Sequence, residues 1–301
     1  MDEMDKIILL SLASNARMPY QTIARKLGVS SNAVKKRVDR LVEMGVIVDF
    51  IVELSLGMFN GEMKLVLLTT DGSEDEQEFC DMLGENPMIG VVGPGSSSTY
   101  MVFATHVGSE GLSELSNFVR SQRNVEEVHF YPILYPKGKK VHFTKSHLRV
   151  LGLLSEDARM KVEEISKRTN FAPRTVRRLI NEIIESEGVR IGLMWDLNAG
   201  DSIGFILRVE WHPERADASK VMQLLSNFPE YYMPIISATE PVIFATFVVS
   251  NVKDIDRIVS RIKSDPSIKN LVTYLGKKSR VYPDLRNYEL QELIAGATRP
   301  K

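Results

Sequence analysis

An internal repeat constrains this sequence more than any other feature, because a chain that repeats itself builds the same structural unit twice. The segment Asn15–Met18 (Asn-Ala-Arg-Met) recurs 142 residues later as Asp157–Met160 (Asp-Ala-Arg-Met). Residues 102–105 recur as 243–246, with the offset changed by one. We therefore interpret the 301 residues as two tandem copies of one two-part unit. The matched pairs at offset 142 are Ile8 and Val150, Leu9 and Leu151, Leu12 and Leu154, Ile23 and Ile165, Val34 and Val176, Lys35 and Arg177, Lys36 and Arg178, Val38 and Ile180, and Leu41 and Ile183.

The first part of each copy is predicted to be helical. Apolar residues between Ile7 and Leu27 follow one helix face, and Gly28 can adopt the left-handed conformation that ends a helix. Ser30 or Ser31 then offers a side-chain oxygen to cap the next helix. These residues predict a helix-turn-helix.

The second helix of this motif is predicted at about 31–44, and residues 45–50 alternate as a short strand, which is the expected wing. The second copy repeats this design, with Pro173 at a favoured first-turn position. Its expected elements are a helix at 162–169, a turn at 170–172, a helix at 173–186 and a strand at 188–192.

The second part of each copy alternates strand and helix in the order β-α-β-β-α-β. This order predicts a ferredoxin-like domain, with helices on one face of an antiparallel sheet. The fold class is therefore α+β, in which two winged helix-turn-helix domains alternate with two ferredoxin-like domains. The predicted domains are 1–50, 61–135, 143–197 and 202–283, followed by a C-terminal tail at 284–301.

Positive charge gathers in the helical parts, although the formal net charge of the chain is only −1. Residues 17–48 contain seven Lys or Arg and two acids, and residues 159–190 contain eight and five. A solvated helix face explains such residues by itself, but on the second helix of a helix-turn-helix they favour binding to DNA phosphates and bases. The candidate DNA-binding residues are Ser31, Asn32, Lys35, Lys36, Arg40, Arg174, Thr175, Arg177 and Arg178.

Residues 4–10, the turn 27–30 and the closing segment 40–47 resemble the winged helix-turn-helix of Lrp/AsnC transcription regulators. The resemblance implies a cytoplasmic, sequence-specific regulator that binds double-stranded DNA, with no catalytic residue and no cofactor. It also implies that the βαββαβ domain mediates oligomerisation and effector binding. We expect the two sheets to pair face to face, because each carries helices on one side only. A pairing within the chain and a homodimer both satisfy this requirement.

The loop after Val92 is the candidate effector site that the resemblance indicates. In the family, a motif with Gly and Asp near this loop helps to bind an amino acid. This chain has glycines there but no aspartate, so a flexible turn is the default interpretation. The candidate effector contacts are Gly93, Gly95, Ser97 and Thr99.

Two other functions share this layout. Siroheme decarboxylases also combine two such units, but they carry Arg and His near the central strands, and residues 97–103 here contain neither. A protein-binding adaptor with inactive helix-turn-helix domains is the other alternative.

The five histidines and the single Cys80 have no metal-ligand spacing, and Cys80 is predicted to be a buried apolar side chain. The apolar runs are too short to cross a membrane.

Overall fold

The computed structural model describes residues 1–200 and 202–298, and the chain divides into two compact units. One unit contains both ferredoxin-like regions, and the other contains both helix-turn-helix regions. Each unit therefore combines equivalent parts of the two copies. The first unit comprises residues 1–6, 63–135 and 196–282, and the second comprises 7–62, 136–195 and the stretch from Pro283.

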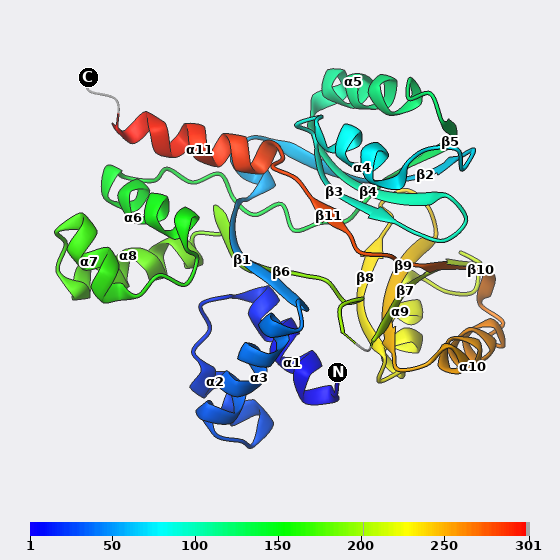
Figure 1. Ribbon diagram of the computed structural model, residues 1–301, viewed down its shortest axis with the longest axis horizontal. Helices are drawn as coiled ribbons and strands as arrows, with labels where there is room; N and C mark the ends of the chain where they lie inside the picture. The colour runs from blue at the N-terminus through cyan, green and yellow to red at the C-terminus, as the bar shows by residue number, and fades with distance from the viewer. Residues whose placement is uncertain (201, 299–301) are drawn as a thin grey trace. The chain divides into compact units, whose positions relative to one another are not determined.

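Three helices form each helix-turn-helix, as the repeat predicts (Figure 1). In the first copy, Val34, Val38 and Leu41 are at most 2% exposed, which confirms the predicted inner face of the second motif helix. In the second copy, the matched Val176 and Ile183 are fully buried. The helices are α1 (Glu3–Ser14), α2 (Tyr20–Leu27) and α3 (Ser31–Glu43), then α6 (Lys145–Glu156), α7 (Val162–Thr169) and α8 (Pro173–Glu185).

The turns of the two motifs use different residues for the same geometry. Gly28 ends α2 with a φ of 67°, and Asn170 ends α7 with a φ of 57°. Asn is one of the few other residues that adopts this left-handed conformation at low cost. Ser30 caps α3, because its side chain accepts a hydrogen bond from the Ala33 amide. In the second copy Pro173 starts α8 without a side-chain cap.

The expected wing strands belong instead to a sheet shared by the two copies. Strand β1 (Ile47–Leu54) pairs antiparallel with β6 (Val189–Trp195), and Ile51 lies opposite Gly192. Figure 1 shows these two strands between the helices of the two copies. The wing strands predicted at 45–50 and 188–192 are therefore confirmed as β1 and β6, and the structure adds that they pair with each other. A lone strand exposes unpaired backbone groups, and the equivalent strand of the other copy satisfies them.

In the other unit, both copies form the predicted βαββαβ arrangement. The first sheet has the strand order β11-β3-β4-β2-β5, and the second has the order β10-β7-β9-β8. The first copy consists of β2 (Gly61–Thr70), α4 (Glu76–Gly84), β3 (Ile89–Pro94), β4 (Thr99–Val107), α5 (Gly108–Arg120) and β5 (Val125–Pro132), after a short 3-10 helix η1 (Leu56–Met58). The second consists of β7 (Ile203–Trp211), α9 (Ala218–Ser226), β8 (Tyr231–Ile236), β9 (Val242–Val249), α10 (Val252–Lys263) and β10 (Ile268–Leu275).

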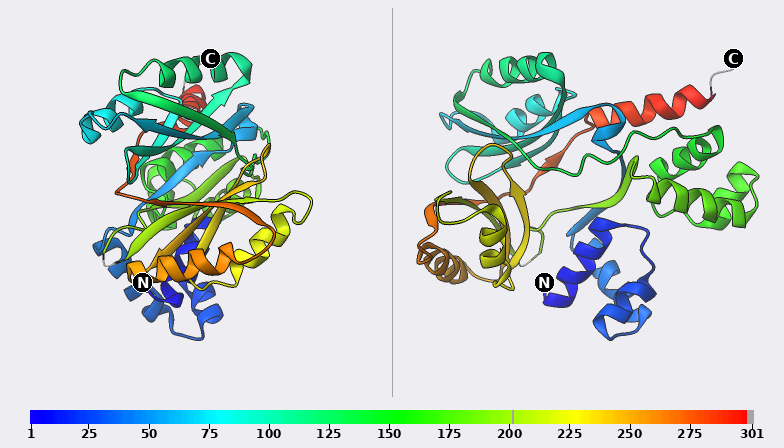
Figure 2. Two further views of the ribbon diagram at one scale, coloured as in Figure 1. Left: turned by 90° about the vertical axis from the view of Figure 1, so that its right-hand side faces the viewer. Right: turned by 180° about the vertical axis from the view of Figure 1, so that it is seen from behind.

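The two sheets pack face to face within the chain. Side chains alternate along a strand, so β2 directs Val66 toward α4 and α5 and directs Leu65 toward the second sheet. Leu65 and Tyr131 form one buried cluster with Val242 and Phe244 of the second sheet. Figure 2 shows the helices on the outer faces and the two sheets between them. The predicted pairing of the sheets occurs inside one chain.

Segments after the last strand of each copy cross to the other sheet. In the first copy, Ile133 bridges Ser237 at the edge next to β8. In the second copy, Gly276 bridges Gly95, and β11 (Arg280–Val281) then pairs antiparallel with β3. This exchange pairs strand edges that would otherwise be exposed.

The predicted C-terminal tail contains a helix, α11 (Leu285–Thr298), and residues 299–301 of that tail lie outside the described residues. Helix α11 packs against α6 and β1, and its Leu290 is 1% exposed. The sequence analysis assigned no helix to this segment, and the structure shows one over 285–298. Leu290, Leu293 and Ile294 provide a short apolar face, which contacts the core of the second helix-turn-helix.

Candidate nucleic-acid interface

Helix α3 presents a polar face to solvent in the first copy. Asn32, Lys35, Lys36 and Arg40 are all exposed, and Ser31 lies at the start of the same helix. The spacing of 3, 4 and 8 residues from Asn32 places them on adjacent turns of one helix. Their backbone is fixed from below by the buried side chains of α3, so the structure brings together the five residues that the sequence predicts here.

One of these cations already has an anionic neighbour. Lys35 Nζ lies 2.7 Å from Asp39 Oδ2, and both side chains are at least half exposed. The hydrogen bond to Asp39 raises the pKa of Lys35, so the ammonium form is favoured. An exposed pair of this type is weak in water, so a phosphate can replace Asp39 as the partner.

Helix α8 places the second set of predicted residues together. Arg174, Arg177 and Arg178 are exposed, and Thr175 is half-buried. Arg178 Nη1 lies 2.6 Å from Glu182 Oε1, and Arg177 Nη2 lies 3.7 Å from Glu163 Oε1. The structure therefore places the second set of candidate residues on one helix, but acids of the same domain accompany two of its arginines.

Glu182 is held by a second partner. His147 Nε2 lies 2.9 Å from Glu182 Oε2, and this hydrogen bond, followed by the one from Arg178, lowers the pKa of the Glu182 carboxyl. The residue that matches Glu182 in the first copy is Arg40. A fixed anion in the second copy thus replaces a cation in the first.

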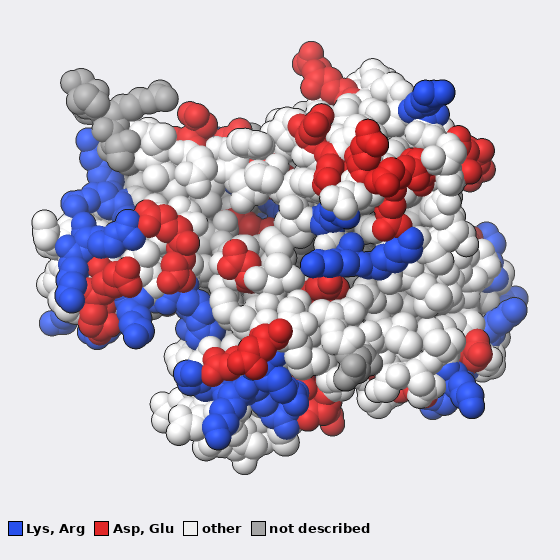
Figure 3. Space-filling view, in the orientation of Figure 1, with Lys and Arg blue, Asp and Glu red and all other residues white. Residues whose placement is uncertain are grey.

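The two motifs also differ in overall charge. Helices α2 and α3 carry six basic and two acidic residues, whereas α7 and α8 carry five basic and four acidic residues. Figure 3 shows Lys and Arg gathered over α2 and α3, and a closer mixture of both signs over α7 and α8. The potential that attracts a polyanion is therefore stronger at the first motif.

The structure brings the four candidate effector residues together at the β3–β4 turn. Gly93 belongs to β3, Thr99 begins β4, and Ser97 has a φ of 57°. The Gly95 amide donates to Thr99 O at 2.7 Å. The second copy passes close to this turn, because a Cβ on Gly95 would lie 3.4 Å from Leu275 O and 3.2 Å from Thr99 O. Close approach of the backbone therefore favours a glycine at position 95, and effector binding by these residues stays a prediction.

Other candidate chemistry is limited in the described residues. No group of three or more His, Cys, Asp or Glu there could hold a metal ion. Cys80 is fully buried, as predicted, and burial raises the pKa of its thiol to about 11, so the thiol stays protonated. In the part of the chain that the structure describes, no helix has the length and hydropathy needed to span a bilayer.

Sequence reasoning missed two residues at the contact between the motifs. Arg17 and Arg159 belong to the repeated segments Asn15–Met18 and Asp157–Met160, and each reaches the other copy. The repeat itself was the available signal, because a short polar motif that recurs in a turn needs a structural reason.

Comparisons with known proteins agree with this architecture. The model of a winged helix-turn-helix DNA-binding family matches residues 1–48 and 143–187. An uncharacterized HTH-type transcriptional regulator from Pyrococcus horikoshii is 30% identical over 129 residues, which are 42% of this chain and 80% of that protein. The HTH-type transcriptional regulator LrpA of the same organism is 48% identical over 54 residues, which are 18% of this chain and only 38% of LrpA.

Among solved structures, the siroheme decarboxylase NirDL in complex with an iron-uroporphyrin III analogue has a similar fold. The TM-score is 0.59 at 13% sequence identity, and the match covers 98% of this chain and 99% of that chain. At this identity the similarity extends to the fold alone. It supports the arrangement of two helix-turn-helix motifs and two ferredoxin-like domains in one chain.

Proposed function

This chain belongs to the Lrp/AsnC family of winged helix-turn-helix transcription regulators, which bind DNA, and we propose that α3 is its main DNA-reading helix. The observation that carries this proposal is the exposed face of Asn32, Lys35, Lys36 and Arg40 on a capped, well-packed helix. The major groove of B-DNA is wide enough to admit a helix. Lys and Arg can meet phosphates, and Asn32 and Lys36 can reach base edges.

Helix α8 is proposed as a second, weaker reading helix. Two of its three arginines, Arg177 and Arg178, must exchange Glu163 and Glu182 for the DNA when they bind phosphate. Both carboxylates then remain near the phosphates and repel them. A second contact still raises the overall affinity, because it forms within the complex at a high effective concentration.

One chain is proposed to act as the equivalent of a dimer. The sheets pair within the chain through Leu65, Tyr131, Val242 and Phe244, so both reading helices are supplied without a second chain. A homodimer of such chains presents four motifs and remains the alternative assembly. Light scattering over a range of concentrations distinguishes a constant mass of 34.0 kDa from one that doubles. The proposed site of action is the cytoplasm, and a small-molecule effector at 93–99 stays a proposal.

The test begins with selection of bound DNA from a random pool at near-physiological salt. The selected duplex is then titrated with the wild type and with the double variant Lys35→Ala/Lys36→Ala at several salt concentrations. We expect a loss of roughly ten- to a hundredfold in affinity, because two charge-assisted contacts are removed. The slope of log K against log salt should fall by about one for each lost phosphate contact.

Lys253→Ala/Lys263→Ala is the matched control, because both lysines are exposed on α10 and the change in net charge is the same. This control should leave DNA binding within about twofold, since α10 lies outside the helix-turn-helix domains. Equal losses of DNA affinity in the two double variants would mean that net charge alone causes the effect, and would contradict the proposed role of α3. Absence of any salt-dependent DNA binding would favour the protein-binding adaptor.

A tetrapyrrole enzyme is the second candidate function, and the whole-chain similarity to NirDL favours it. Against it, residues 97–103 contain no Arg or His to hold a carboxylated macrocycle. Incubation of the purified protein with siroheme, followed by gel filtration and an absorbance spectrum, tests this function directly. Pigment that elutes with the protein would support the enzyme, and colourless protein would argue against it.

A further inference from the structure

The repeated turn segments form a contact between the two helix-turn-helix domains. Arg17 of the first copy donates from Nη1 to Ala158 O at 2.8 Å and from Nη2 to Met160 O at 3.0 Å. The neighbouring Ala16 amide donates to Ile191 O of β6 at 2.8 Å. Two nitrogens of the Arg17 guanidinium thus donate hydrogen bonds to backbone carbonyls of the second segment, Asp157–Met160.

Arg159 makes the reciprocal contact from the second copy to the first. Its guanidinium carbon lies 4.5 Å from the centroid of the Tyr20 ring and 4.9 Å from that of Phe50. Tyr20 begins α2, so Arg159 packs against the helix that precedes the proposed reading helix of the first copy.

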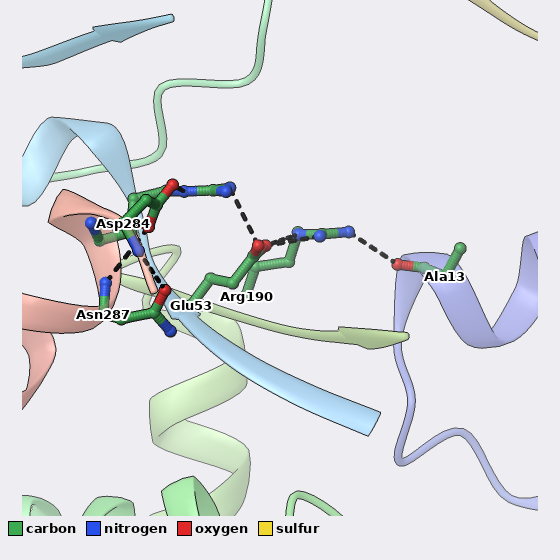
Figure 4. A network of polar contacts seen from close by, with 6 residues as sticks. Ala13, Glu53, Arg190, Asp284 and Asn287 are labelled. Carbon is green, nitrogen blue, oxygen red and sulfur yellow. Dashed lines mark hydrogen bonds and ion pairs between the residues drawn. The ribbon is translucent and has the colours of Figure 1, made fainter. Parts of the chain in front are cut away.

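A third arginine crosses between the copies at the shared sheet. Arg190 of β6 donates from Nε to Glu53 Oε2 of β1 at 2.8 Å, and its Nη1 reaches Ala13 O of α1 at 3.3 Å (Figure 4). The Glu53 side chain is only 11% exposed, so this pair is much less screened by solvent than the pairs on α3 and α8.

The start of α11 supports Glu53 from the other side. Arg286 Nη1 lies 3.0 Å from Glu53 Oε1, and Arg286 Nε lies 2.8 Å from Asp284 Oδ2. Figure 4 shows Asp284 and Asn287 beside this network, and the Asp284 amide donates to Asn287 Oδ1 at 3.0 Å. Both oxygens of Glu53 are thereby occupied, so β1 and β6 are joined by side chains as well as by their backbone.

We propose that Arg17, Arg159 and Arg190 are positioning residues that set one fixed spacing and orientation of α3 relative to α8. This inference rests on the proposed function of both helices. Each arginine starts in one copy and ends in the other, and the planar guanidinium fork fixes direction as well as distance. A rigid pair of reading helices can bind two half-sites at once only when the spacing of the half-sites on the DNA matches the spacing of the helices.

The experiment uses the full chain and duplexes that carry the two half-sites found in the selected DNA, one for each reading helix, with their separation varied by single base pairs over about one helical turn of 10–10.5 base pairs. For the wild type we expect a single peak, with affinity about tenfold lower 2 to 3 base pairs away. Arg17→Ala and Arg159→Ala should keep single-motif affinity within about twofold and flatten this peak. A residue that merely stabilised the fold would not change the spacing profile alone.

Two further variants keep the result interpretable. Arg159→Lys retains the charge but loses the planar stacking over Tyr20 and Phe50, so it should also flatten the peak if the alanine variants fail to fold. Arg168→Ala is the control, because its ion pair with Glu156 is exposed and stays within the second copy. It should leave the spacing profile unchanged.

Four outcomes separate this inference from the proposed function on which it rests. A flattened peak in the Arg17 and Arg159 variants, with the control unchanged, supports the inference. A sharp peak that survives in folded Arg159→Lys and Arg17→Ala overturns it and leaves DNA binding intact. DNA binding by the wild type without any spacing preference also overturns it, whereas no DNA binding at all would reject the proposed function itself.

Discussion

The two helix-turn-helix domains of this chain have the same framework and different surfaces. Their buried residues match in register, and both turns end their first motif helix with a left-handed residue, Gly28 or Asn170. Their charges do not match, because Arg40 corresponds to Glu182 and Gln21 to Glu163. The comparison teaches that core and turn positions define this motif, whereas the exposed face can change sign without a change of fold.

The largest expected difference is in DNA affinity. Arg177→Ala/Arg178→Ala should weaken binding to the selected duplex only about two- to fivefold, against the ten- to hundredfold loss expected for the Lys35 and Lys36 variant. Arg177 and Arg178 already contact Glu163 and Glu182, so removal of these two arginines costs less DNA affinity. Titration of both double variants in one buffer makes the measurement. Equal losses would mean that the two motifs contribute alike.

The second prediction reverses the difference. Glu163→Gln/Glu182→Gln removes the anions beside the arginines of α8, so DNA binding should become about three- to tenfold tighter at low salt and should depend more steeply on salt. Glu78→Gln/Glu85→Gln on and after α4 has the same change in net charge and is the control. Tightening by both variants alike would point to net charge rather than to the acids of the second motif.

The third prediction concerns the turns. Gly28→Ala should lower the free energy of unfolding by about 1 kcal/mol, because a Cβ is unfavourable at a φ of 67° even though no atom lies within 4 Å of it. Asn170→Gly should be neutral or stabilising by a few tenths of 1 kcal/mol. Urea unfolding followed by circular dichroism measures both. An unchanged free energy of unfolding in Gly28→Ala would mean that the first copy does not require a left-handed residue at this turn.

The smallest expected effect depends on pH. The Glu182 pKa is lowered in the folded state, so its contribution to stability is fully present above the unfolded pKa of about 4.3 and disappears as the pH falls through the folded value. The difference in Tm between the wild type and Glu182→Gln should therefore close as the pH drops below about 4. A difference that stays constant down to pH 3 would contradict the pairing with His147 and Arg178.

Most secondary-structure elements could be predicted because their causes are local. The apolar run of β2 and the helix spacing of Val34, Val38 and Leu41 lie within a few residues, and both elements were recovered in the structure. The second turn has Thr169-Asn170-Phe171 where the first has Leu27-Gly28-Val29. The backbone conformation of the two turns is nevertheless similar, since Asn tolerates the left-handed region that Gly28 adopts. The exposed candidates on α3 and α8 follow from the same periodicity.

Other features depended on partners distant in the sequence. Strand β1 is readable as a strand, but nothing in residues 47–54 specifies β6 as its neighbour. Arg178 pairs with Glu182, four residues along the same helix, whereas Arg177 pairs with Glu163 on α7. Sequence alone could count these charges but could not assign their partners.

The order of residues along the chain is enough to show that two copies of one unit are present, where most of their helices and strands lie, and which helix faces carry cations. Only in the folded chain do the equivalent parts combine, so that sheets pair with sheets and β1 pairs with β6. The fold also places Arg17 and Arg159 between the motifs. The physical reason is that periodicity and turn conformation act over a few residues, whereas the burial of an apolar face or a strand edge depends on whichever complementary surface the whole chain provides.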